Sequence, residues 1–89
     1  MSELENSFKK YSEEVKNLTN RPSDEILLEM YALFKQATVG DCNIEEPGGW
    51  FNFEAKEKYK AWNEKKGKSN DECMLLYIEK AKVLISNDN

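Results

Sequence analysis

The sequence predicts an all-α protein, a four-helix bundle with a long connection between the second and third helices. Apolar residues recur at steps of three and four in four segments, and serine, proline and glycine separate these segments. No segment shows the alternation of a strand. The 89 residues suffice for one core but not for two, so we expect a single domain over residues 1–89.

The first helix is predicted to begin after Ser2, because Glu5 follows three residues later in the spacing of a capping box. Its apolar stripe comprises Leu4, Phe8, Tyr11, Val15 and Leu18. We expect Pro22 to stop it, since proline lacks the N–H that a helix needs.

The second helix is predicted from about Asp24 to Thr38 or Val39, with Ser23 as N-cap and Gly40 closing it. The segment "DCNIEEPGGWFN", residues 41–52, contains proline and a glycine pair and has no sustained period. We interpret it as a long connection, of the kind that is often functional in compact domains.

The third helix is predicted over residues 53–66, with lysines in its last turn and Gly67 at its end. Ser69 opens the fourth helix, and Glu72 again has capping-box spacing. Its predicted buried stripe is Met74, Ile78, Ala81 and Ile85. The last three residues, "NDN", are expected to fray.

Composition argues against several functions. With 13 basic and 17 acidic side chains the net charge is -4, which disfavours general affinity for nucleic acid or anionic membrane. There is no histidine, so the commonest general base and zinc ligand are missing, and we expect neither catalysis nor a metal site. No signal-peptide pattern or membrane-spanning stretch is present, and Cys42 and Cys73 have no CxxC spacing. A cytoplasmic protein with reduced thiols is expected, with no integral membrane segment.

The second helix carries two apolar stripes. Ile26, Met30, Leu33 and Ala37 form an ordinary core stripe. A second stripe of Leu27, Leu28, Tyr31 and Phe34 needs a cover, either a neighbouring helix or a ligand. Lys35, four residues after Tyr31, favours an anionic ligand that also has an apolar part.

The third helix interleaves Tyr59 and Trp62 with six lysines against three glutamates between Glu54 and Lys68. A solvated lysine face over aromatic core residues is the simplest interpretation, and we expect Trp62 to be buried. Such a mixture also suits single-stranded nucleic acid, but the acidic total charge and the lack of arginine here argue against it.

Four stretches resemble, in order and spacing, the acyl-CoA-binding proteins. They are "EEVKNL" at 13–18, "YALFKQATVGDCN" at 31–43, "KYKAWNEKKGKS" at 58–69 and "MLLYIEKA" at 74–81. The resemblance covers nearly the whole chain. It implies a four-helix bundle that binds long-chain fatty acyl-CoA without catalysis, as a monomeric carrier with transient contacts to acyl-CoA-using enzymes or membranes.

The resemblance also implies site residues. Tyr31 and Lys35 would contact the nucleotide and its 3'-phosphate, Lys58 a phosphate and Lys16 the region of the adenine. Residues implied for the rest of the ligand are Tyr77 and Phe34 for the head group, and Leu27 and Leu28 for the acyl groove.

The sequence departs from the family pattern at several positions. Phe34 keeps a ring for stacking on adenine but lacks the usual hydroxyl. Tyr11 and Ser12 replace small residues near the ligand, so Tyr11 is expected to narrow the groove or shift its chain-length preference. Glu54 stands where lysine is common. Trp50 or Phe51 in the long connection either covers the ligand or plugs the bundle, and we favour the plug.

Two rival functions remain. A helical interaction module could receive an amphipathic partner helix on the second stripe. An enzyme acting on the ester is disfavoured, because no histidine and no pair of nucleophile and base is evident.

Overall fold

The computed structural model describes residues 2–49 and 52–88. These residues form four α-helices and one 3₁₀ turn and contain no strand, which confirms the predicted fold class. The elements are α1 (Glu3–Glu14), η1 (Val15–Asn17), α2 (Asp24–Thr38), α3 (Phe53–Asn63) and α4 (Asn70–Ser86). Trp50 and Phe51, one of which was expected to cover the ligand or plug the bundle, lie outside the described residues.

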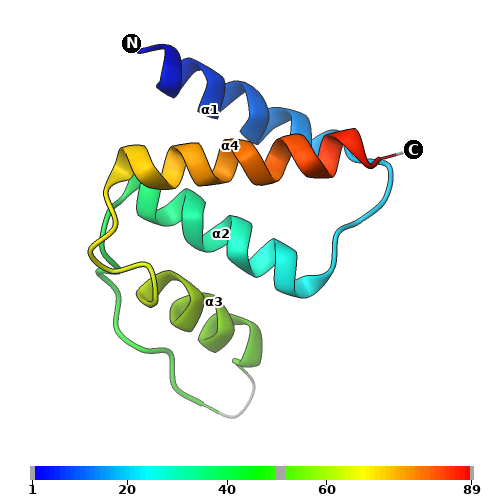
Figure 1. Cartoon of the computed structure of the whole chain (residues 1–89). Helices are drawn as coiled ribbons and strands as arrows, with labels where there is room; N and C mark the ends of the chain where they lie inside the picture. Colours follow the sequence, from blue (N-terminus) through cyan, green and yellow to red (C-terminus); the bar gives the residue numbers. More distant parts are fainter. Residues whose placement is uncertain (1, 50–51, 89) are drawn as a thin grey trace.

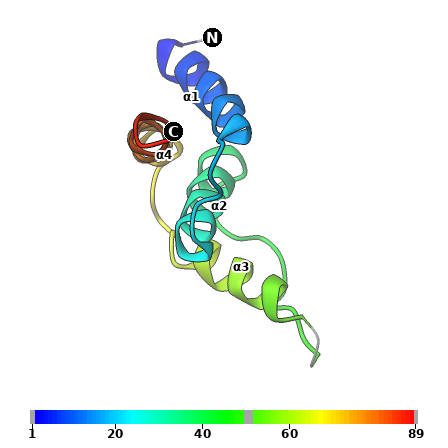
Figure 2. The same cartoon turned by 90° about the vertical axis from the view of Figure 1, so that its right-hand side faces the viewer.

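The helices form a thin, curved array. α4 packs against both α1 and α2, and α3 packs against α2 alone among the described helices. α4 lies between α1 and α2 in the view of Figure 1 and to one side of them in the view of Figure 2. The principal extents of the molecule are 37 × 30 × 15 Å. α1 and α4 run in one direction and α2 and α3 in the other (Figure 1). The long connection therefore returns along the molecule, so that α3 starts beside the N-terminal half of α2.

The core lies where α1, α2 and α4 meet. Its buried cluster consists of Phe8, Met30, Leu33, Ala37, Cys73, Tyr77, Ile78 and Ala81. Most of the predicted core stripe of α2 is therefore confirmed, but Ile26 is 40% exposed and does not join the core. Trp62 is 2% exposed, as predicted.

Serine caps start three of the four helices. Ser2 and Glu5 form the complete capping box that their spacing predicts. The hydroxyl of Ser23 accepts the N–H of Ile26 at the start of α2, and that of Ser69 accepts the N–H of Glu72 at the start of α4. These bonds satisfy backbone donors that have no partner within the helix. The serines therefore determine where α2 and α4 begin.

The first helix ends earlier than predicted. α1 stops at Glu14, η1 tightens the chain through Asn17, and Leu18 is extended, so Pro22 is not what ends the helix. The carboxylate of Asp88 accepts the backbone N–H groups of Thr19 and Asn20 at 2.8 and 2.9 Å. The expectation of a frayed C-terminus is thus wrong at Asp88, which fixes the segment between α1 and α2.

The third helix is also shorter than predicted, ending at Asn63. Tertiary contacts hold the following turn. The Lys65 ammonium lies 2.7 Å from a Glu29 oxygen, and the Gly67 N–H donates to the Asp41 carboxylate at 2.9 Å. Gly67 has a φ of +89°, a conformation that glycine adopts without strain.

The end of α2 is tied to the turn between α3 and α4. The Trp62 indole N–H donates to the Gly40 carbonyl at 2.8 Å, and the buried Gln36 amide donates to Asp41 and to the Lys68 carbonyl. These bonds position α3 against α2. In the part of the chain that the structure describes, no helix is long and apolar enough to span a bilayer.

Candidate functional site

Two pockets adjoin on the N-terminal half of α2. The first, of about 430 Å³, lies between α1 with η1, α2 and α4, and the second, of about 580 Å³, lies between α2 and α3. Leu27 and Tyr31 line both, so the pockets meet at these two side chains. The sequence-predicted residues that line at least one pocket are Lys16, Leu27, Leu28, Tyr31, Phe34, Lys58 and Tyr77.

The first pocket has an aromatic wall and a cationic rim. The Phe34 ring is 38% exposed and stacks on Phe8 with centroids 5.4 Å apart, and Phe8 meets Tyr77 edge-to-face at 5.1 Å. Burial raises the pKa of the Tyr77 hydroxyl, which therefore stays protonated at neutral pH. Lys16 is exposed and is carried by η1. Partly exposed rings beside a free ammonium suit a planar base with a phosphorylated sugar.

The second pocket has an apolar floor and a charged rim. Leu27 and Leu28 of α2 are half-buried and supply apolar surface. The Lys58 ammonium of α3 lies 5.4 Å from the centroid of the Tyr31 ring and 3.0 Å from a Glu54 oxygen. This arrangement places apolar surface and a cation on neighbouring parts of one cavity.

Lys35 is the predicted site residue that lines neither of these two pockets. Its ammonium lies 5.0 Å from the centroid of the Trp62 ring on α3. The two cation–π contacts thus cross the α2–α3 interface in opposite directions, Lys58 on Tyr31 and Lys35 on Trp62. Both lysines lie at the same interface. On each helix the lysine and the aromatic residue are four positions, about one helical turn, apart.

Several lining residues were not predicted. Leu18 and Pro22 line the first pocket and Arg21 the second, all from the segment between α1 and α2. Leu18 was expected on the apolar stripe of the first helix and Pro22 as its stop, and the arginine between them was a usable signal of a site. Tyr11, predicted to narrow the groove, lines neither pocket and instead packs against the core.

Comparison with known proteins agrees with this arrangement. The sequence model of the family described as "Acyl CoA binding protein" matches residues 5–81. The chain belongs to the acyl-CoA-binding protein family. It is 44% identical to "Acyl-CoA-binding protein homolog" of Drosophila melanogaster, over 89% of this chain and 91% of that one. It is 45% identical to "Acyl-CoA-binding protein" of Brassica napus, over 92% of this chain and 88% of that one.

A solved structure of the family shares the fold. The crystal structure of Oryza sativa acyl-CoA-binding protein 2 superposes with a TM-score of 0.87 at 40% identity, over 93% of this chain and 89% of that one. The resemblance inferred from four short stretches is therefore confirmed over most of the chain.

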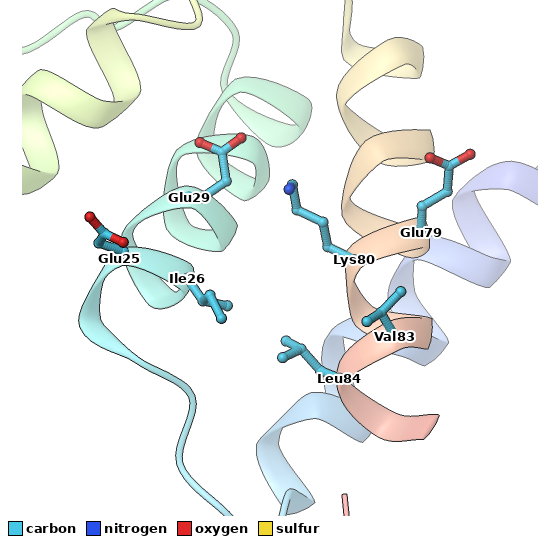
Figure 3. Close-up of a pocket in the computed structure, with 7 residues that line it drawn as sticks. All are labelled: Glu25, Ile26, Glu29, Glu79, Lys80, Val83 and Leu84. Carbon is cyan, nitrogen blue, oxygen red and sulfur yellow. The ribbon is translucent and has the colours of Figure 1, made fainter. Parts of the chain in front are cut away.

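A third pocket, of about 470 Å³, opens between α2 and α4. Ile26 and Leu84 point toward one another across it, and Glu25, Glu29 and Lys80 stand around them (Figure 3). Three glutamates and one lysine line it, so its rim is more acidic than that of the second pocket and is less suited to the phosphates of an acyl-CoA. It contains none of the residues that the family resemblance implies. Within residues 2–49 and 52–88, no cluster of three or more acidic or cysteine side chains could hold a metal ion.

Proposed function

We propose that this chain binds long-chain fatty acyl-CoA esters as a single domain and carries them without chemical change. The observation that supports this most directly is the pair of pockets that meet at Leu27 and Tyr31, one with aromatic rings and a lysine, the other with a leucine floor. A ligand with a phosphorylated head and an apolar tail needs both kinds of surface. Membership of the acyl-CoA-binding protein family supports the same ligand.

In this proposal the adenine occupies the first pocket, and the phosphates lie near Tyr31, where the first pocket meets the second. The adenine stacks on the exposed part of Phe34, near Lys16 and Tyr77. Lys58 and Lys35 contact phosphates from the α2–α3 interface, and the hydroxyl of Tyr31 donates a further bond. The acyl chain then runs over Leu27 and Leu28 in the second pocket, which brings the thioester close to the junction of the two.

The two ends of the ligand have different roles. A chain of about sixteen carbons gains on the order of 10 kcal/mol at roughly 0.8 kcal/mol per buried CH₂, before the costs of association and incomplete burial. The tail therefore supplies much of the affinity. The lysines supply specificity, since they distinguish the coenzyme A ester from a free fatty acid.

We further propose a monomeric, cytoplasmic carrier that maintains a pool of acyl-CoA. It would meet acyl-CoA-using enzymes or membrane surfaces transiently, without binding nucleic acid and without a cofactor. The helical interaction module is not favoured, because the family and its named relatives point to acyl-CoA.

Calorimetric titration tests the proposal. Palmitoyl-CoA should bind tightly at one to one, and palmitate and free coenzyme A should each bind weakly. Lys35→Ala should lose about 2 kcal/mol, roughly thirtyfold, because it removes one half-buried charge partner. Leu27→Asp should abolish binding. Absence of binding by folded wild-type protein would overturn the proposal.

The same variants separate the carrier from the interaction module. A surface for a partner helix would lose its target with Leu27→Asp but would be nearly indifferent to Lys35→Ala, whereas the carrier loses ligand with both. Incubation with palmitoyl-CoA and a thiol reagent tests catalysis. Steady release of coenzyme A above the uncatalysed rate would show that the chain is a hydrolase.

A further inference from the structure

Lys58, one of the cations of the second pocket, already has a carboxylate partner. Glu54 and Lys58 lie one turn apart on α3, and their side chains approach to 3.0 Å. The Lys58 ammonium also lies 5.4 Å from the centroid of the Tyr31 ring. Lys58 therefore faces the pocket as one half of an ion pair.

The rest of the rim is also acidic. The second pocket is lined by two cations, Arg21 and Lys58, and by three carboxylates, Asp24, Glu54 and Glu57. Arg21 pairs with Asp24 at 2.9 Å. Both cations thus have an intrachain partner, and the remaining carboxylate leaves the rim with an excess of one negative charge. Such a rim opposes the approach of a phosphate.

We propose that Glu54 is a specificity-determining residue that competes with the phosphates of the ligand for Lys58. This rests on the proposed acyl-CoA function. When a phosphate reaches the ammonium, it meets a carboxylate of like charge at the same nitrogen. The ligand must then displace Glu54 or bind beside it. Either event lowers the affinity for a phosphorylated head group and leaves the contacts of the apolar tail unchanged.

The proposal predicts a gain from removing the competitor. Glu54→Gln keeps the size of the side chain and removes its charge. Because both partners are partly exposed, the gain is modest, about two- to fivefold in affinity for palmitoyl-CoA at low salt. It should shrink at physiological ionic strength, since salt screens exposed charges.

Two controls isolate the pair. Glu57 lines the same pocket on the same helix, and Glu57→Gln removes the same charge at a different distance from Lys58. Glu57→Gln should increase the affinity for palmitoyl-CoA less than Glu54→Gln does. In a Lys58→Met background the Glu54→Gln substitution should give no gain, because the group for which Glu54 competes is absent.

The experiment is a calorimetric titration of palmitoyl-CoA into the wild type and these variants, Glu54→Gln/Lys58→Met included. Circular dichroism should first show an unchanged helical spectrum for each. The expected result is a gain that appears only when Lys58 is present. An equal gain for Glu57→Gln, or a gain that persists without Lys58, would overturn the proposal while the carrier function stood. Binding by no protein in the set would overturn both.

Discussion

Replacing Trp62 by phenylalanine should loosen α3 from α2. The indole is 2% exposed, and its N–H bonds the Gly40 carbonyl at 2.8 Å. Losing that bond should cost about 0.5–1.5 kcal/mol, because water can reach the half-buried Gly40. The smaller ring should cost about 1–2 kcal/mol more in a closely packed site. Lys35 keeps an aromatic ring beneath it, so these two losses alone make up the total, about 1.5–3.5 kcal/mol.

Urea unfolding followed by circular dichroism measures this loss without relying on tryptophan fluorescence. A domain of 89 residues typically has about 4–13 kcal/mol of stability, so the change is easily resolved. Phe53→Ala is a matched control on the same helix, because Phe53 is 70% exposed and should change stability by less than about 0.5 kcal/mol. If Trp62→Phe cost no more than this control, the bond to Gly40 and the burial of the indole would not be what holds α3.

Three further predictions concern the ends of the chain, its thiols and its ligand. The two backbone donors hold the pKa of Asp88 below its ordinary 3.8, so its stabilisation is complete above that pH and is lost as the pH falls through the lower folded pKa. Asp88→Asn should therefore flatten the acid side of the stability curve, and a curve parallel to the wild type would contradict this. Cys73 is buried and burial raises the pKa of its thiol, so Ellman's reagent should modify the half-buried Cys42 first and Cys73 only in urea; equal rates in native protein would refute it. Palmitoyl-CoA at a free concentration of about 100 times Kd should raise the free energy of unfolding by about 2.7 kcal/mol, and a ligand-independent transition would argue against binding to the folded state.

A helix boundary could be predicted from the sequence where it depends on neighbouring residues, and less well where the chain around it is held by residues far away in the sequence. α2 was predicted to within one residue at its end because its signals are local: a serine cap at Ser23, acidic residues directly after it and a glycine at position 40. The ends of α1 and α3 were misplaced, and the segments that follow these helices are held by residues distant in the sequence. Asp88 lies 69 residues from Thr19 in the sequence, and Lys65 lies 36 residues from Glu29.

The candidate site shows the same division. The second stripe of α2 was visible as a face with too many apolar residues, and Leu27 and Tyr31 do line the two pockets. The partner helices were not visible from periodicity, because a pattern along one helix does not reveal which helix packs beside it. Lys58 and Tyr77 were assigned by family resemblance alone. The pairing of Lys58 with Glu54 required the arrangement of side chains on α3.

The most direct test of the central claim is an NMR titration that maps where palmitoyl-CoA binds. Side-chain methyl signals of Leu27 and Leu28 and ring signals of Tyr31 should shift with the stoichiometry of one ligand per chain. Signals of Val83, which faces the pocket between α2 and α4, should change little. If Val83 and Ile26 shifted while Leu27 and Tyr31 did not, the ligand would occupy the pocket between α2 and α4, and the two adjoining pockets would not be the acyl-CoA site.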